Sequence, residues 1–315
     1  MHAPLSVVLF TVLSGAGYGL TVLFLLADRL ALGGPVGGGE RLAAGLTAVA
    51  LITVGLLFST GHLARPRRAW RSLFRVRTSW LSREAALALL FYPVAGGFVA
   101  AYGLSGWAYT PLVTALAVLT GLLAAATLIA TGMIYACVQA VREWHQGLTP
   151  VNYLVIGLAL GAGVLTLIRA AAGADPAPAA ALGAGLLLTA AVTKAAWYAW
   201  NAVPGGAGAT TATGLSAGPV RLLDSGESAA SFLAHEFLHP LAGDRRRGRY
   251  YRGLVLLGGF LLPAAGLAVV AWSGSLPWAA AALALAFAGA LVERWLLFAE
   301  ARHAVRLYYG AAERL

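Results

Sequence analysis

Apolar residues gather along this chain in long blocks of about twenty residues, with short polar segments between them. At a rise of about 1.5 Å per residue, an α-helix of that length crosses the roughly 30 Å hydrocarbon core of a bilayer. The alternation of apolar and polar residues that is typical of outer-membrane β-barrel strands is missing. The pattern predicts eight membrane-spanning helices, at Leu5–Leu26, Leu42–Leu63, Glu84–Leu104, Pro111–Ala140, Asn152–Ala172, Ala179–Asn201, Gly253–Trp272 and Pro277–Glu300.

The composition supports a membrane protein. Of the 315 residues, 60% are hydrophobic and only 11% are charged, and the mean hydropathy is +0.78. A soluble domain carries about 25% charged residues, and over half of its surface faces water. A water-soluble enzyme and a disordered protein are therefore excluded. We predict a single polytopic all-α domain over residues 1–315, and a division into two four-helix halves near residue 150 is compatible with the pattern.

Positive charges fall mostly on one side of the predicted bundle. An even number of spans places both termini on one side, together with segments 64–83, 141–151 and the long loop 202–252. These segments carry seven, one and six cationic residues and the C-terminal tail carries three, which makes 17 against 3 on the opposite side. By the positive-inside rule, the first side is predicted to be cytoplasmic. In a membrane protein such clusters bind lipid or acidic partners more often than nucleic acid, so no nucleic-acid partner is expected.

The cysteine and histidine positions exclude several metal centres. Cys137 is the single cysteine, so this chain cannot hold a disulfide framework, a thiolate zinc cluster or a Cys-held iron–sulfur centre. Haem ligation needs imidazoles facing each other inside the bundle. No histidine lies at mid-depth, and we therefore expect no haem. The six histidines lie at or beyond the predicted cytoplasmic ends of the spans: His2, His62, His145, His235, His239 and His303.

His62 and Glu84 lie at the same membrane boundary, at the end of the second predicted span and the start of the third. A quinone carbonyl needs a hydrogen-bond donor, and its reduction takes up protons together with electrons. An imidazole and a carboxylate at the boundary between water and lipid supply both the donor and a proton route. Ionisable groups at membrane depth are costly, which favours a function. In the alternative interpretation, His62 is an ordinary interfacial residue and Glu84 pairs with Arg83 or Arg68.

Two tyrosines lie within the predicted spans. The hydroxyl groups of Tyr18 and Tyr135 need hydrogen-bond partners at that depth. Either residue could line a ligand pocket, and packing within the bundle is the alternative role for both.

The remaining charges within the spans are Lys194, Arg169 and the neighbouring pair Glu293 and Arg294. Each lies within about two or three turns of a span end, so we expect the long side chains to reach the interface by snorkelling. Glu293 and Glu300 share a helix face at seven-residue spacing and could extend a proton path. No mid-depth charge pair of the kind that a transporter uses is apparent.

Residues 235–239, HEFLH, match the H-E-x-x-H pattern, in which two imidazoles on one helix face bind zinc. A catalytic zinc needs a third protein ligand, and no recognisable one follows. The segment belongs to a predicted short amphipathic helix, Ser228–Leu241, in the long polar loop. We interpret it as a surface helix and keep a membrane zinc metalloprotease as a distant alternative.

The run from His62 to Glu84, HLARPRRAWRSLFRVRTSWLSRE, resembles the segment that joins the second and third helices in the DMSO-reductase membrane-anchor family, the DmsC type of NrfD-like anchors. That segment follows the pattern HLGxPxRAW…SxLSxE, and Ala64 stands here in place of the usual glycine. The opening MHAPLSVVLFTVLSGAGYGL and the closing ERWLLFAEARHAVRLYYG look like the branch that includes the anchor of quinone-linked sulfite dehydrogenase.

The resemblance implies an eight-helix anchor without haem. Such an anchor holds an iron–sulfur subunit and a molybdopterin catalytic subunit to the membrane and exchanges electrons with ubiquinone or menaquinone. The family's quinone-site histidine falls on His62, its acidic residue on Glu84 and the arginine between them on Arg68. Partner docking is expected at the neighbouring arginines Arg65, Arg67, Arg71, Arg75 and Arg77.

The charge count distinguishes two branches of this family. DMSO reductase keeps its catalytic subunits outside the cytoplasm, whereas the quinone-linked sulfite dehydrogenase keeps them inside. The partners dock on the face that bears His62, which the positive-inside rule places in the cytoplasm. We therefore expect an inner-membrane anchor that passes electrons from sulfite oxidation to quinone. Docking of an acidic iron–sulfur subunit also selects for arginine there, so the anchor of a DMSO or other S- or N-oxide reductase that oxidises menaquinol stays as the alternative.

Overall fold

The computed structural model describes residues 4–61, 65–203 and 245–309, with a few isolated positions between 204 and 244. Eight helices in this part of the chain are long and apolar enough to cross a membrane. The predicted all-α, polytopic membrane fold is therefore confirmed. His62, the HEFLH segment and the predicted helix Ser228–Leu241 lie outside the described residues.

Seven of the spans are single α-helices: α1 (Leu5–Leu30), α2 (Gly38–Thr60), α3 (Trp80–Leu104), α4 (Pro111–Ala136), α5 (Leu148–Ala171), α6 (Ala177–Ala202) and α11 (Leu276–Ala299). The remaining span joins three consecutive elements, α9 (Arg245–Leu254), the π-helical η3 (Val255–Leu261) and α10 (Leu262–Ser273). It begins before the predicted Gly253, because the Arg-rich turn that precedes the apolar block is also helical. α4 ends at Ala136 instead of the predicted Ala140, and residues 138–147 fold back beneath the bundle.

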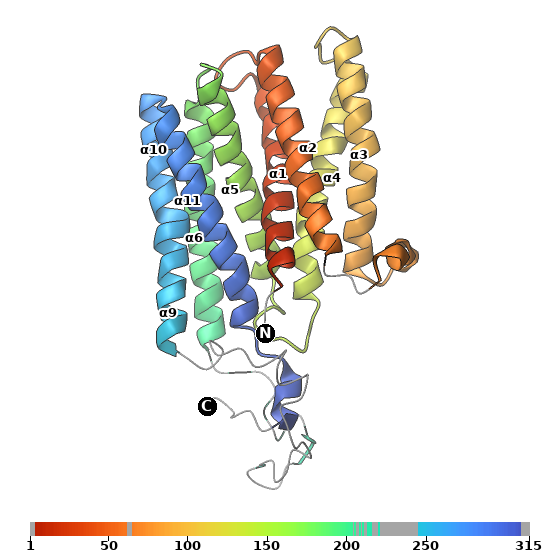
Figure 1. Cartoon of the computed structure of the whole chain (residues 1–315), viewed down its shortest axis with the longest axis vertical. Helices are drawn as coiled ribbons and strands as arrows, with labels where there is room; N and C mark the ends of the chain where they lie inside the picture. The colour runs from red at the N-terminus through yellow and green to blue at the C-terminus, as the bar shows by residue number, and fades with distance from the viewer. Residues whose placement is uncertain are drawn as a thin grey trace.

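The helices run alternately up and down, so that α1 begins and α11 ends at the same end of the bundle (Figure 1). We call this end the terminal face, and the opposite end, with its short connections between helices, the distal face. Side-chain caps mark the start of two of the helices. The Ser79 hydroxyl accepts a hydrogen bond from the Ser82 backbone N–H at the start of α3, and Thr110 caps α4 in the same way immediately before Pro111.

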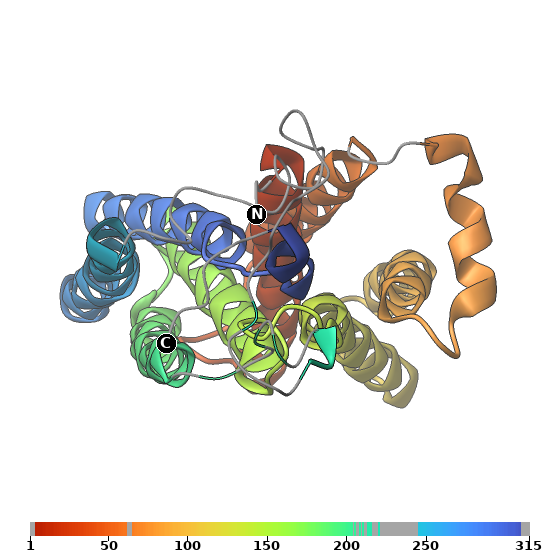
Figure 2. The same cartoon turned by 90° about the horizontal axis from the view of Figure 1, so that it is seen from below.

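α1 lies in the middle of the bundle and packs against α2, α4, α5 and α11 (Figure 2). Small residues make this possible. A Cβ atom on Gly19 of α1 would overlap the backbone of Gly157 on α5, and one on Gly289 of α11 would overlap Gly259 in η3. Close approach of glycine-bearing backbones replaces the hydrophobic effect as a source of helix association in lipid.

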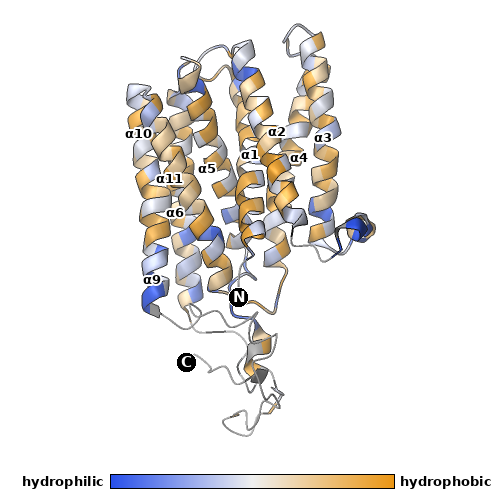
Figure 3. Ribbon diagram, in the orientation of Figure 1, coloured by the Kyte–Doolittle hydropathy of each residue, from blue (hydrophilic) through white to orange (hydrophobic). Residues whose placement is uncertain are grey.

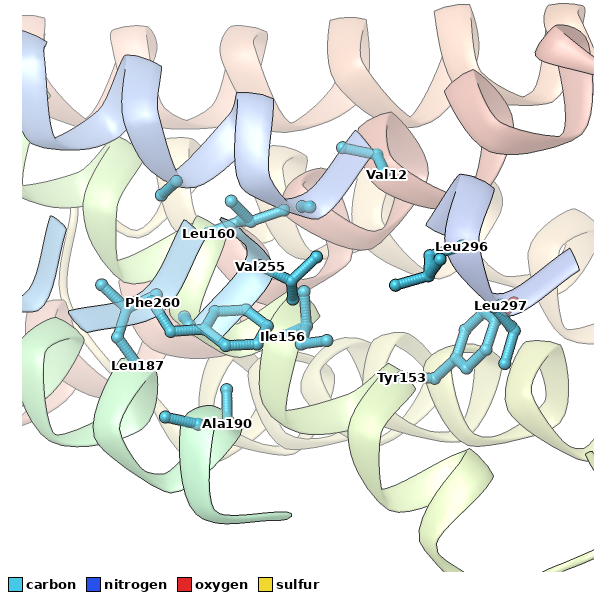
Figure 4. Close-up of a cluster of buried hydrophobic side chains, with 14 of the residues drawn as sticks. Val12, Tyr153, Ile156, Leu160, Leu187, Ala190, Val255, Phe260, Leu296 and Leu297 are labelled. Atoms are coloured by element: carbon cyan, nitrogen blue, oxygen red, sulfur yellow. The ribbon is translucent and has the colours of Figure 1, made fainter. Parts of the chain in front are cut away.

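The largest cluster of buried apolar side chains lies among α1, α5, α6, α11 and the α9–α10 span (Figure 4). Ile156, Leu160, Leu187 and Phe260 are among its fully buried members (Figure 4). α5 contributes to this cluster and also packs on α1 and α4. Through α1 and α5 the first four spans therefore pack directly against the last four.

The Arg-rich segment between α2 and α3 forms a short 3₁₀-helix, η1 (Pro66–Arg75). It packs against α3 and lies outside the bundle at the level of the terminal face (Figures 1 and 2). Within the described residues, the bundle thus presents a basic segment at the end where both α1 begins and α11 ends.

Candidate functional site

Glu84 is buried near the terminal end of α3, about one turn after the helix begins. The Thr131 hydroxyl of α4 donates a hydrogen bond to its Oε1 atom. Arg83 instead donates to the backbone carbonyls of Val76 and Arg77 and lies over the Trp80 ring. Among the described residues no ion pair involves Glu84, so its predicted alternative pairing with Arg83 or with the exposed Arg68 is not formed.

Tyr18 of α1 is buried with its ring edge-on to Phe91 of α3, 5.2 Å between ring centroids. It lies in an apolar cluster with Ile52 of α2 and Leu128 of α4. Its hydroxyl interacts with the Thr127 hydroxyl of α4 and, electrostatically, with the Glu84 carboxyl. Tyr18 therefore packs within the bundle and keeps its hydroxyl within range of polar groups on α3 and α4.

Tyr135 lies one turn after Thr131 on α4, on the same helix face. Its ring stacks on Tyr153 of α5 at 5.5 Å and meets Trp144 and Phe298 edge-on. Glu84 is close enough to both tyrosines of this stack for electrostatic interaction. Glu84 and Tyr135 thus lie at the terminal ends of α3 and α4, whereas Tyr18 lies near the middle of α1, within electrostatic range of Glu84.

His62 is outside the described residues, but the chain reaches it directly from the end of α2 at Thr60 and Gly61. Its position relative to Glu84 stays a prediction, as does any metal binding by residues 235–239. In the described part of the chain no group of three or more His, Cys, Asp or Glu side chains is arranged to hold a metal ion.

The arginines predicted to dock a partner are all exposed, on and beside η1. They share the segment with exposed aromatic rings, since Trp70 and Phe74 pack edge-on and the Arg71 guanidinium lies over the Trp70 ring. We call these five residues the basic surface: Arg65, Arg67, Arg71, Arg75 and Arg77.

Two charged networks close the distal face. Arg169 of α5 does not snorkel as expected. It is buried, bonds the Glu40 carboxylate at 2.9 Å and donates to the backbone carbonyls of Gly33 and Asp175.

In the second network the Asp28 carboxylate accepts hydrogen bonds from Arg41, Tyr102 and Tyr109. Burial and the neighbouring Asp28 carboxylate raise the pKa of Tyr109, so this phenol stays protonated and donates. The short connections of the distal face are therefore fixed by saturated polar contacts.

Comparison with known proteins agrees with this architecture. The family model of the DMSO reductase anchor subunit (DmsC) matches residues 1–198. A subunit of the sulfite dehydrogenase of Allochromatium vinosum is 33% identical over 330 residues, which cover 98% of this chain and 99% of that protein. The chain belongs to the DMSO reductase anchor subunit family. It is a multi-pass membrane anchor subunit of an oxidoreductase.

Sequence reasoning about the anchor missed a buried charged cluster near the terminal face. Lys194 of α6 is 1% exposed, and its ammonium lies 2.5 Å from the carboxylate of Glu293 on α11, which is 0% exposed. Arg294, 2% exposed, pairs with the same carboxylate at 3.3 Å. The expectation that these three side chains snorkel is wrong, because helices α5, α6 and α11 enclose them. The sequence did offer a signal for this cluster, because Lys194 and Glu293 carry opposite charges at similar depth in two different spans.

Proposed function

We propose that this chain is the quinone-reactive anchor of a three-subunit molybdopterin and iron–sulfur oxidoreductase that oxidises sulfite. An iron–sulfur subunit would carry electrons from a molybdopterin catalytic subunit to a quinone bound beside Glu84. The full-length similarity to a sulfite dehydrogenase subunit supports this choice of complex. The iron–sulfur clusters and the molybdopterin belong to the partners, and the anchor itself needs no haem.

The burial of Glu84 beside a single hydroxyl donor carries the proposal. An unpaired carboxyl within a membrane span is expensive, and such residues mark proton relays and binding sites. The Tyr18 hydroxyl, deeper in the bundle, lies within electrostatic range of this carboxyl and adds a second polar group. These groups fit a quinone, whose oxygens accept hydrogen bonds and take up protons when the ring is reduced. Ubiquinone and menaquinone both meet this description.

Each site residue has a defined role. Glu84 passes protons, and Thr131 holds its carboxyl in place. His62, which follows the end of α2, donates a hydrogen bond to a quinone oxygen. Arg68 steadies the pocket or the partner, and Tyr18 and Tyr135 line the site. Of the eight spans, α2 and α3 have the smallest share of residues buried inside the bundle, so a lipid-soluble quinone reaches this region directly from the bilayer.

The partners dock at the terminal face, which is cytoplasmic in the bacterial inner membrane. The excess of cations on that side, 17 against 3, supports this orientation. The basic surface on η1 offers exposed guanidinium groups to an acidic iron–sulfur subunit, and charge complementarity of this kind steers association and fixes register.

Substitution in the purified complex tests the quinone site. We expect His62→Ala and Glu84→Gln to lower quinone-coupled turnover by about 100-fold, since acid–base groups contribute roughly 10²–10⁴ to such rates. Reduction of a soluble dye by the catalytic subunit should stay within twofold of the wild type. His145→Ala is the matched control, because that imidazole also lies at the terminal face and is occupied by the Ala136 carbonyl. Wild-type quinone kinetics in both site variants would refute the proposal.

The family description favours a second candidate, an anchor that delivers electrons from menaquinol to a DMSO or other S- or N-oxide reductase. The two candidates differ in the substrate of the partner and in the side of the membrane on which it lies. Assays of the intact complex with sulfite and with DMSO, together with protease accessibility of the catalytic subunit in sealed vesicles, separate them.

A further inference from the structure

The buried cluster of Lys194, Glu293 and Arg294 is part of a longer series of polar side chains. Within otherwise hydrophobic helices, hydrophilic positions recur near the terminal ends of α6 and α11 (Figure 3). Two buried cations share one carboxylate here, at 2.5 Å and 3.3 Å. Burial of such charges costs more than their attraction returns unless their surroundings are polar, so an apolar packing role alone would not favour them.

On one side the series continues to the quinone site. The Arg294 guanidinium lies 3.5 Å from the centroid of the Tyr153 ring, and Tyr153 interacts electrostatically with both Glu293 and Glu84. The stacked Tyr135 ring lies between Tyr153 and the α4 turn that carries Thr131. A chain of titratable and hydroxyl groups therefore links α11 to α3 through α5.

On the other side the series reaches the edge of the bundle. The Lys194 ammonium lies 3.9 Å from the Trp197 ring centroid and 5.3 Å from that of Tyr198. Tyr198 interacts electrostatically with Glu300, which bonds the partly exposed Arg252 at 2.8 Å. Burial raises the pKa of Glu300, while Arg252 opposes this change, so Glu300 takes up a proton more readily than a carboxyl in water.

Several polar atoms along this series have no hydrogen-bond partner in the described part of the chain: the Tyr198 hydroxyl, the amide nitrogens of Asn152 and Asn201, and Oε2 of Glu300. Buried polar groups are almost always satisfied, by protein or by water. A stretch of unpaired hydroxyl and amide groups beside a charged cluster therefore favours hydration, which a purely structural ion pair does not need.

From this geometry we infer that a polar row of Glu84, Tyr153, Glu293, Lys194, Tyr198 and Glu300 conducts protons between the quinone site and the aqueous edge at Arg252. The inference rests on the proposed quinone site at Glu84. Reduction of one quinone takes two electrons from the partner and two protons, and Glu84 delivers each proton and is reprotonated through the row. A proton that moves from the Lys194 ammonium to the Glu293 carboxylate neutralises both groups, and the Tyr153 ring, 3.5 Å from the Arg294 guanidinium, stays against the one cation that remains.

Deuterium exchange at Glu84 tests the row without turnover. In the intact complex mixed rapidly with D₂O, the Glu84 carboxyl band is followed by infrared spectroscopy and is identified by its loss in Glu84→Gln. We expect Glu293→Gln and Lys194→Met to slow this exchange and the quinone-coupled rate at least tenfold, with dye reduction within twofold. Glu40→Gln is the matched control, since it removes an equally buried, Arg-paired carboxylate at the distal face and should change neither rate.

A double variant, Lys194→Met with Glu293→Met, separates conduction from structure. Replacing Glu293 alone leaves two buried cations, Lys194 and Arg294, without a carboxylate, whereas the double variant leaves only Arg294, so we expect its melting temperature to exceed that of Glu293→Gln. Exchange and coupled turnover should stay slow. Recovery of both rates in the double variant, or wild-type exchange in Glu293→Gln, would overturn the conduction role. Slowed exchange together with wild-type quinone kinetics in Glu84→Gln would instead uphold the row and refute the quinone site.

Discussion

The two ends of the bundle use the same residue types in different ways. At the distal face Arg169 bonds a carboxylate and two backbone carbonyls, and Asp28 accepts from one guanidinium and two phenols. Toward the terminal face the Tyr198 hydroxyl and the amide nitrogens of Asn152 and Asn201 are also buried, but they have no protein partner in the described residues.

This difference indicates a division of labour. Charge networks in which every group has a partner stabilise the connections between helices. Removing one partner leaves a buried donor or acceptor unsatisfied, which lowers the stability of the fold. Groups that must exchange protons with a substrate cannot be saturated by the protein. The distal face therefore fits a structural role, and the terminal face keeps the polar groups that the proposed chemistry needs.

The largest expected loss of stability concerns the Arg169 network at the distal face. Arg169→Met leaves the Glu40 carboxylate buried without its guanidinium and frees two carbonyl oxygens, so we expect a loss of about 3–5 kcal/mol in the free energy of unfolding. Unfolding of the anchor in mixed micelles by SDS measures it. A loss below about 1 kcal/mol would contradict a stabilising role for this network.

A smaller effect is expected in the second distal network. Tyr102→Phe removes a hydroxyl that donates to the Asp28 carboxylate at 2.7 Å, and hydrogen bonds to charged groups contribute about 1.5–3 kcal/mol. The same SDS titration should show a loss in that range, while quinone-coupled turnover stays at the wild-type value. Slowed turnover at unchanged stability would show that the distal face also takes part in the reaction and would contradict its purely structural role.

The smallest change in stability is expected for Tyr153→Phe, the same substitution at the terminal face. Its hydroxyl interacts with the neutral Tyr135 hydroxyl and with no charged hydrogen-bond partner, so removal should lower the free energy of unfolding by only about 0.5–1 kcal/mol. Deuterium exchange at Glu84 should nevertheless slow severalfold, because this hydroxyl belongs to the polar row. A stability loss as large as that of Tyr102→Phe, with unchanged exchange, would show that Tyr153 is structural.

Much of the anchor was predictable from local sequence. Blocks of apolar residues set eight spans, since helix length in a bilayer is fixed by the thickness of the hydrocarbon. The segment from His62 to Glu84 identified the DMSO reductase anchor family, and the comparisons confirm that family. Glu84 was recognisable as a candidate because a carboxyl at the start of an apolar span is conspicuous without any knowledge of its neighbours.

Hydropathy gives the depth of a residue along its helix but not the direction in which its side chain points around the helix axis. For this reason Lys194, Arg169 and Glu293 were expected at the lipid boundary, whereas packing of α5, α6 and α11 turns them inward. Only the tertiary structure brought Thr131 to Glu84 and Lys194 to Glu293, because these pairs join different helices whose rotation depends on close contacts such as that of Gly259 with Gly289. The sequence by itself determined the number, length and charge asymmetry of the spans, and helix packing decided which polar groups meet.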